Sequence, residues 1–114
     1  TDDMLIIRGV NVFPSQIEEA LLRVEGAAPH YLIEVDRPGA LDELTVSVEM
    51  RPQDFSDEMK QVQSLRERIG RAIHSITGLT ARVNLVAPQT IERSAGKAVR
   101  VRDRRKLRDP ADGR

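Results

Sequence analysis

The stretch that decides the fold is Tyr31–Met50, YLIEVDRPGALDELTVSVEM. Apolar residues recur at every second position on both sides of a central loop: Tyr31, Ile33 and Val35 before it, then Leu44, Val46, Val48 and Met50 after it. A period of two is typical of strands with one buried face. Pro38 and Gly39 lie between the two runs and favour a turn there. We therefore predict two antiparallel strands joined as a hairpin.

Amphipathic helices are expected on both sides of this hairpin. Before it, Pro14 suits the first turn of a helix and Gly26 suits its end, which places a helix near residues 15–25. After it, Ser56 can cap a second helix that Gly78 ends. The predicted buried stripe of the second helix consists of six apolar residues at helical spacing: Met59, Val62, Leu65, Ile69, Ile73 and Ile76.

The remaining segments complete an α+β pattern. Residues 4–13 favour extended structure and are interrupted by Gly9, which predicts two short strands around a glycine turn. Residues 81–86 alternate again and predict one more strand. The order predicts a small, mostly antiparallel sheet with two helices on one face, plus a short N-terminal two-strand hairpin. We expect one domain over residues 1–107 and a disordered tail over residues 108–114.

Length and composition exclude several classes of protein. The chain has 114 residues, which suits one domain. Because no apolar run approaches the ~20 residues of a membrane-spanning helix and the first residues do not resemble a signal peptide, we expect a cytoplasmic protein without a membrane partner. Cysteine is absent, and the only histidines, His30 and His74, cannot make a convincing metal cluster. We expect both histidines to be structural and the chain to bind no metal.

Positive charge is concentrated at the C-terminal end. Residues 1–91 hold nine Lys/Arg and fourteen Asp/Glu, whereas residues 92–114 hold nine and four. Such a segment can be a nucleic-acid tail, a solvated end or a loop that meets phosphate or carboxylate elsewhere. An RNA-binding sheet needs a run of exposed aromatic residues, and the chain has only three aromatic residues and no such run, so we expect no nucleic-acid partner. The arginines that alternate from Arg100 to Arg104 favour a solvated edge.

A candidate catalytic lysine, Lys97, lies in this basic segment. Gly96 removes a side chain immediately before it, so the backbone can approach a partner closely while the long lysine stem carries its charge outward. That arrangement suits delivery of a lysine to phosphate or carboxylate. The alternative is a surface loop whose lysine is only solvated, because a Gly-Lys pair is a weak motif.

Two motifs at opposite ends of the chain resemble one family. Residues 2–18, DDMLIIRGVNVFPSQIE, resemble the start of the small C-terminal domain of adenylate-forming enzymes, the acyl- and aryl-CoA synthetase superfamily. Within that superfamily, their sequence most resembles phenylacetate–CoA ligases and their aryl-CoA ligase relatives. Residues 93–100, RSAGKAVR, resemble the lysine loop of the same family. Two departures are Gln16, in place of the usual glutamate, and Ala95, in place of a frequent acidic residue.

The resemblance implies a reaction in two steps. In the full-length enzyme, an aryl-acetic acid such as phenylacetate reacts with ATP and Mg²⁺ to give an acyl-adenylate and diphosphate, and the acyl group then passes to coenzyme A, as in phenylacetate catabolism. Between the steps, the C-terminal domain rotates on a large N-terminal domain that binds ATP and the acid. That domain would be the main partner of this chain, whose sequence has no Gly-rich phosphate loop. We therefore expect the isolated chain to be inactive and to bind none of these ligands tightly.

The resemblance also implies roles for individual residues. Lys97 would enter the active site during adenylation, and Asp2 would be the hinge between the domains. The other residues form two groups: a loop that supports the lysine, with Arg93, Ser94 and Gly96, and a turn that faces the active site and the pantetheine tunnel during thioester formation, with Ile7, Arg8 and Gly9.

One alternative to the ligase is a stand-alone small-molecule-binding or regulatory α+β domain without catalysis. Such a domain would dimerise through its sheet edge, so a homodimer stays open as a further partner. It predicts a complete gene that begins near Met4, whereas the ligase predicts several hundred upstream residues with a Ser/Thr/Gly-rich phosphate loop. The reading frame distinguishes the two.

Overall fold

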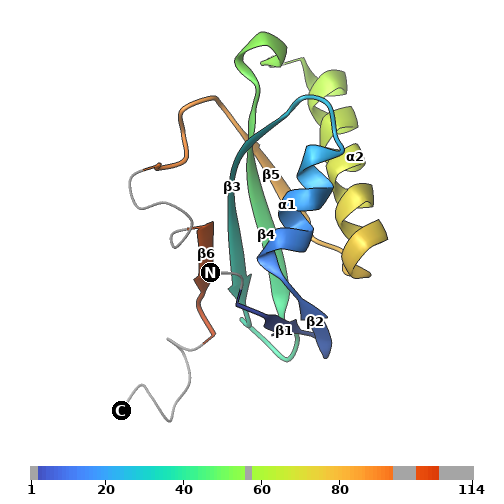
Figure 1. Ribbon diagram of the computed structural model, residues 1–114, viewed down its shortest axis with the longest axis vertical. Coiled ribbons are helices and arrows are strands. Elements are labelled where there is room, and N and C mark those ends of the chain that lie inside the picture. Colours follow the sequence, from blue (N-terminus) through green and yellow to red (C-terminus); the bar gives the residue numbers. More distant parts are fainter. Residues whose placement is uncertain (1–2, 56–57, 94–99, 106–114) are drawn as a thin grey trace.

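The computed structural model describes residues 3–55, 58–93 and 100–105 and consists of a helical layer on a four-stranded sheet (Figure 1). Both helices cover the same face of the sheet, and a separate two-stranded hairpin lies at one end. The elements follow in the order β1 (Leu5–Ile7), β2 (Val10–Val12), α1 (Pro14–Leu22), β3 (Ala27–Asp36), β4 (Glu43–Met50), a 3-10 turn η1 (Pro52–Asp54), α2 (Met59–Thr77), β5 (Arg82–Val86) and β6 (Val101–Asp103).

The four-stranded sheet confirms the predicted α+β class and the central hairpin. Its strand order is β5-β4-β3-β6, and β3 pairs antiparallel with β4 in a register that sets Ile33 opposite Val46. The sheet is mixed rather than mostly antiparallel, because β5 pairs parallel with β4 and β6 pairs parallel with β3. The reason for the first pairing is that α2 is a crossover, which returns the chain to the starting end of β4. The sequence did not reveal β6, which has only three residues.

The helices begin and end close to the predicted positions. Pro14 is the first residue of α1, but the helix ends at Leu22, earlier than expected. In α2, Gly78 forms the expected left-handed end with φ 81°, whereas the predicted cap Ser56 lies outside the described residues and Glu58 precedes the first turn. The prediction that Met59 is buried is wrong, since its side chain is 67% exposed. Burial along α2 starts at Leu65.

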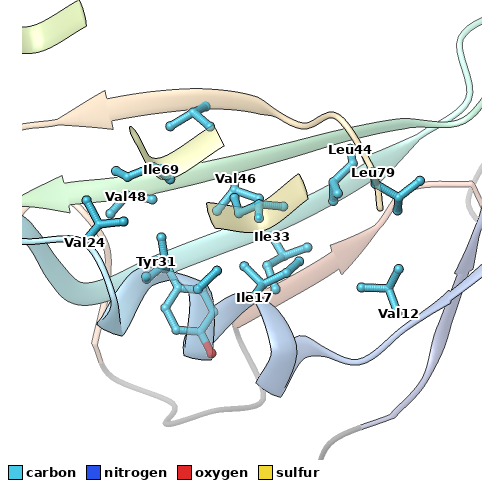
Figure 2. Close-up of a cluster of buried hydrophobic side chains, with 14 of the residues drawn as sticks. Val12, Ile17, Val24, Tyr31, Ile33, Leu44, Val46, Val48, Ile69 and Leu79 are labelled. Carbon is cyan, nitrogen blue, oxygen red and sulfur yellow. The ribbon is translucent and has the colours of Figure 1, made fainter. Parts of the chain in front are cut away.

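The core lies between the two helices and the covered face of the sheet (Figure 2). The alternating residues of the hairpin supply most of it: Tyr31, Ile33, Val35, Leu44, Val46, Val48 and Met50 are all buried. Ile17 of α1 and Ile69 of α2 are fully buried against them. This packing holds β3, β4 and α1, which carry acidic residues of the candidate site. Neither described helix is long and apolar enough to cross a membrane, and the expected cytoplasmic location stays a prediction.

Candidate functional site

A buried carboxylate in β4 organises the segment that leads to the candidate lysine. Glu49 is only 1% exposed, although it alternates with the core-facing residues Val48 and Met50. It is covered by the segment after β5: Oε1 accepts a hydrogen bond from the backbone N–H of Gln89 at 2.9 Å, and Oε2 accepts one from that of Ile91 at 2.8 Å. Glu49 therefore fixes the backbone of this segment.

Arg93 completes the coordination of Glu49. Its Nη1 donates to Oε2 and its Nη2 to Oε1, both at 2.8 Å, which is the two-pronged arrangement that arginine makes with a carboxylate. The hydrogen bonds from Arg93 lower the pKa of Glu49 to about 2, against the effect of burial, and the two backbone donors add to this shift. The same interaction raises the pKa of Arg93. The pair is therefore fully ionised at neutral pH and strongly oriented.

A second anchor holds the chain on the far side of residues 94–99. The guanidinium of Arg100 donates to Oε1 of Glu18 at 3.2 Å and lies 5.1 Å from the centroid of the Tyr31 ring. The Tyr31 hydroxyl donates to the same oxygen of Glu18 at 2.7 Å. Burial, with help from Glu18, raises the pKa of Tyr31 to about 12. The chain thus leaves a fixed point at Arg93 and returns to another at Arg100.

Four of the predicted site residues lie outside the described residues: Asp2, Ser94, Gly96 and Lys97. Their roles stay predictions. Arg93, by contrast, is described, and its contacts with Glu49 place it at the base of the segment that contains Lys97. The structure also describes the predicted turn residues at the other end of the chain.

These turn residues form the tight connection between β1 and β2. Ile7 pairs with Val10, which leaves Arg8 and Gly9 as a two-residue loop. Their φ angles are 51° and 76°, so both have the left-handed backbone of a type I′ turn. Glycine adopts that conformation freely, whereas arginine does so at a cost. Ile7 is buried beneath the turn, and Arg8 and Gly9 are exposed at its tip.

The basic run after residues 94–99 is largely paired. The prediction of a solvated edge is wrong for Arg100, which is half-buried, whereas Arg104 is paired and still exposed. Arg100 contacts Glu18, and Arg104 contacts Glu34 of the neighbouring strand at 2.7 Å. Arg105 contacts Asp103 at 2.9 Å and Asp42 at 3.1 Å. Pattern alone could not show that acidic residues of α1, β3 and the β3–β4 loop come to meet this segment. Arg102, in contrast, is exposed.

Comparison with known proteins identifies the family. Residues 9–105 match the family described as AMP-binding enzyme C-terminal domain. The chain belongs to this family. It is 45% identical over 107 residues to a phenylacetate-coenzyme A ligase of Aromatoleum evansii and 44% identical over 107 residues to one of Escherichia coli K12. These alignments cover 92% and 94% of the chain but 24% of each relative, so the chain spans about a quarter of their length.

Solved structures of the AMP-binding C-terminal domain family agree with this assignment. A domain of phenylacetate-coenzyme A ligase from Bacteroides vulgatus is 40% identical, with a TM-score of 0.83 over 92% of this chain and 95% of that one. A 2-hydroxyisobutyryl-CoA ligase in complex with 2-HIB-AMP and CoA, in the thioesterification state, is 35% identical, with a TM-score of 0.84 over 93% of this chain and 22% of that one. The expected resemblance is thereby confirmed.

The acidic anchors were not found from the sequence. Glu18, Asp42 and Glu49 each receive an arginine that lies more than 40 positions away in the chain. A lone carboxylate between Val48 and Met50 in an otherwise apolar strand end was a usable signal, because a charged group is seldom buried without a partner. No comparable signal marked the partners of Glu18 or Asp42.

Proposed function

We propose that this chain is the C-terminal domain of an ATP-dependent phenylacetate–CoA ligase. The full-length enzyme would convert phenylacetate, ATP and coenzyme A into phenylacetyl-CoA, AMP and diphosphate. In this proposal the domain covers residues 1–107, works with an N-terminal domain of the same enzyme and turns about Asp2. The phenylacetate-coenzyme A ligases named above support the acid, and the 2-hydroxyisobutyryl-CoA ligase supports the reaction class alone.

The structural observation that carries the proposal is the anchoring of the lysine segment at both ends. Arg93 is bound to the buried Glu49, and Arg100 is bound to Glu18 and stacked on Tyr31. The described residues on either side of positions 94–99, Arg93 and Arg100, are therefore bound to the sheet and to α1. A catalytic lysine needs such support, because a small misplacement of a reacting group costs much of the rate.

The chemistry explains why a single lysine matters in the first step. When the carboxylate attacks the α-phosphate of ATP, two anionic groups come together and further negative charge develops on the phosphate oxygens. The ammonium group of Lys97 would offset this charge in the transition state. In the second step the thiol of coenzyme A attacks the acyl-adenylate and AMP leaves, so the lysine is no longer required. Rotation of the domain would then present the Arg8–Gly9 turn instead.

Magnesium enters the proposal only with its substrate ATP. Among the residues that the structure describes, no group of three or more His, Asp or Glu side chains is placed to hold a metal ion.

The test compares Lys97→Ala with the wild type in the full-length protein that carries this chain. Phenylacetate-dependent exchange of diphosphate into ATP is expected to fall by about 10²–10³-fold, while thioester formation from preformed phenylacetyl-adenylate and coenzyme A persists. Lys60→Ala, which removes an exposed lysine of α2, is the matched control and should leave both reactions unchanged.

Three outcomes would contradict the proposal. Unchanged exchange in Lys97→Ala would refute the role of the lysine. Equal loss of both half-reactions would refute the separation of the two steps. Exchange supported by benzoate or 2-hydroxyisobutyrate but not by phenylacetate would refute the proposed acid while leaving the ligase class intact.

A further inference from the structure

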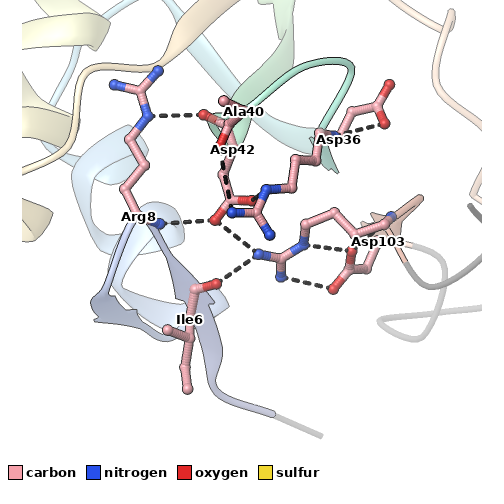
Figure 3. A network of polar contacts seen from close by, with 8 residues as sticks. Ile6, Arg8, Asp36, Ala40, Asp42 and Asp103 are labelled. Atoms are coloured by element: carbon pink, nitrogen blue, oxygen red, sulfur yellow. Dashed lines mark hydrogen bonds and ion pairs between the residues drawn. The ribbon is translucent and has the colours of Figure 1, made fainter. Parts of the chain in front are cut away.

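The Arg8–Gly9 turn is bound by Asp42, which ends the loop between β3 and β4 (Figure 3). Oδ2 of Asp42 accepts a hydrogen bond from the backbone N–H of Arg8 at 2.9 Å. The backbone carbonyl of Asp42 accepts a second from Nε of Arg8 at 2.8 Å. These two bonds stabilise a residue whose positive φ is unfavourable for a side chain other than glycine.

Asp42 also binds the segment after β6. Its Oδ2 accepts a hydrogen bond from Nη1 of Arg105 at 3.1 Å, and the same Nη1 donates to the backbone carbonyl of Ile6 in β1 at 2.6 Å. Nε and Nη2 of Arg105 are bound to the carboxylate of Asp103, both at 2.9 Å. One guanidinium thus joins β1, β6 and the β3–β4 loop (Figure 3).

The carboxylate of Asp42 is buried yet incompletely coordinated. The residue is 8% exposed, and within the described part of the chain Oδ1 has no hydrogen-bond partner. The Nε of Arg37 lies 3.7 Å from that oxygen and supplies charge without a hydrogen bond. Oδ2 binds both the Arg8 N–H and Arg105, whereas Oδ1 faces only the charge of Arg37. Burial of a carboxylate that is coordinated in this way costs free energy, which a simple connection to a surface turn does not require. Its clear structural consequence is the fixed position of Arg8 and Gly9.

We propose that Asp42 is a positioning residue for thioester formation, which holds the Arg8–Gly9 turn and its bridge through Arg105 in the place that coenzyme A requires. The inference rests on the proposed function, because it gives the turn its role in the second half-reaction. Asp42 does not contact the reacting atoms; it acts through the turn. Its loss should therefore damage one half-reaction and spare the other.

The test measures both half-reactions of Asp42→Asn in the full-length protein. The variant keeps the shape of the side chain and removes its charge. We expect thioester formation from preformed phenylacetyl-adenylate to fall by about tenfold or more with a raised KM for coenzyme A, while phenylacetate-dependent diphosphate exchange stays within about twofold of the wild type. Asp36→Asn, at the other end of the same loop, is the matched control and should leave both reactions unchanged.

A second variant, Arg105→Lys, tests the same positioning role if Asp42→Asn does not fold. Lysine keeps the charge but cannot bridge Asp42, Asp103 and the Ile6 carbonyl in the same fixed geometry, so we expect the same selective defect. If Asp42 has only a structural role, both half-reactions will fall in proportion to the folded fraction, and the inference is overturned. A normal rate of thioester formation in a folded Asp42→Asn or Arg105→Lys protein would also overturn it. Failure of the proposed function is separate, since the wild type itself would then give no carboxylate-dependent exchange.

Discussion

Two buried carboxylates bind the two parts of this domain to which functions are proposed, and they do so differently. Glu49 has both oxygens doubly coordinated, by the backbone N–H groups of Gln89 and Ile91 and by the fork of Arg93. Asp42 has one oxygen coordinated by the Arg8 N–H and Arg105, while the other faces Arg37 at 3.7 Å. Residues 89–93, which precede Lys97 in the sequence, are therefore bound to a carboxylate whose oxygens each accept two hydrogen bonds. The Arg8–Gly9 turn is bound to a carboxylate whose other donor, Arg105, also contacts β1 and β6.

This difference has a consequence for stability. A carboxylate with four donors loses much when its charge is removed, because all four hydrogen bonds lose their charged acceptor. A carboxylate such as Asp42, whose Oδ1 accepts no hydrogen bond from the described residues, has fewer hydrogen bonds to lose. We therefore expect residues 89–93 to be held more firmly than the Arg8–Gly9 turn.

The largest effect on stability is expected for Glu49→Gln. The amide replaces an acceptor oxygen with a donor and so faces the Arg93 fork or a backbone N–H with the wrong group. We expect a loss of about 1–3 kcal/mol in the free energy of unfolding, discounted because the Arg93 side chain is 34% exposed. Urea denaturation of this chain measures it. The control Glu43→Gln, an exposed position of the same strand, should change stability by less than about 0.5 kcal/mol.

The pH dependence of the free energy of unfolding tests the contribution of Glu49 directly. Because the folded-state pKa of Glu49 is about 2 and its ordinary value is 4.5, the carboxylate stabilises the fold at every pH above about 4.5, and this contribution is lost as the pH falls toward 2. Wild-type stability should therefore fall across this window, and Glu49→Gln should show a flatter slope there. Denaturation curves at a series of pH values decide the point, and parallel slopes for the two proteins would count against the Glu49 assignment.

The smallest predicted effect concerns the second anchor of the lysine segment. Tyr31 is the only tyrosine and the chain has no tryptophan, so the ultraviolet absorbance of tyrosinate reports on this residue alone. We expect a pKa of about 12 in the folded chain, lowered toward its ordinary value of 10.0 in Glu18→Gln. The neutral phenol is favoured in the fold, so its contribution to stability is present below pH 10 and is lost as the pH rises through 12. A midpoint equal to that in denaturant would refute the contact.

The sequence predicted the elements of this fold better than it predicted the site. Alternation in Tyr31–Met50 revealed the hairpin because the covered face of the sheet is apolar at every second position. The same alternation placed Glu49 on the solvent side, since a period of two says nothing about a segment that returns about 40 residues later to cover that side. The contacts of Arg100 with Glu18 and of Arg105 with Asp42 were missed for the same reason. Their partners are set by tertiary structure, and only a family resemblance could direct attention to their segment.

The most direct test of the central claim, that two anchors serve two half-reactions, is to measure Glu49→Gln and Asp42→Asn side by side in the full-length protein. The account predicts a crossover. Glu49→Gln should lower phenylacetate-dependent diphosphate exchange by about tenfold to a hundredfold and affect thioester formation less, whereas Asp42→Asn should do the reverse. If both variants lower the two half-reactions in the same proportion, the anchors merely stabilise the fold and the claim is wrong.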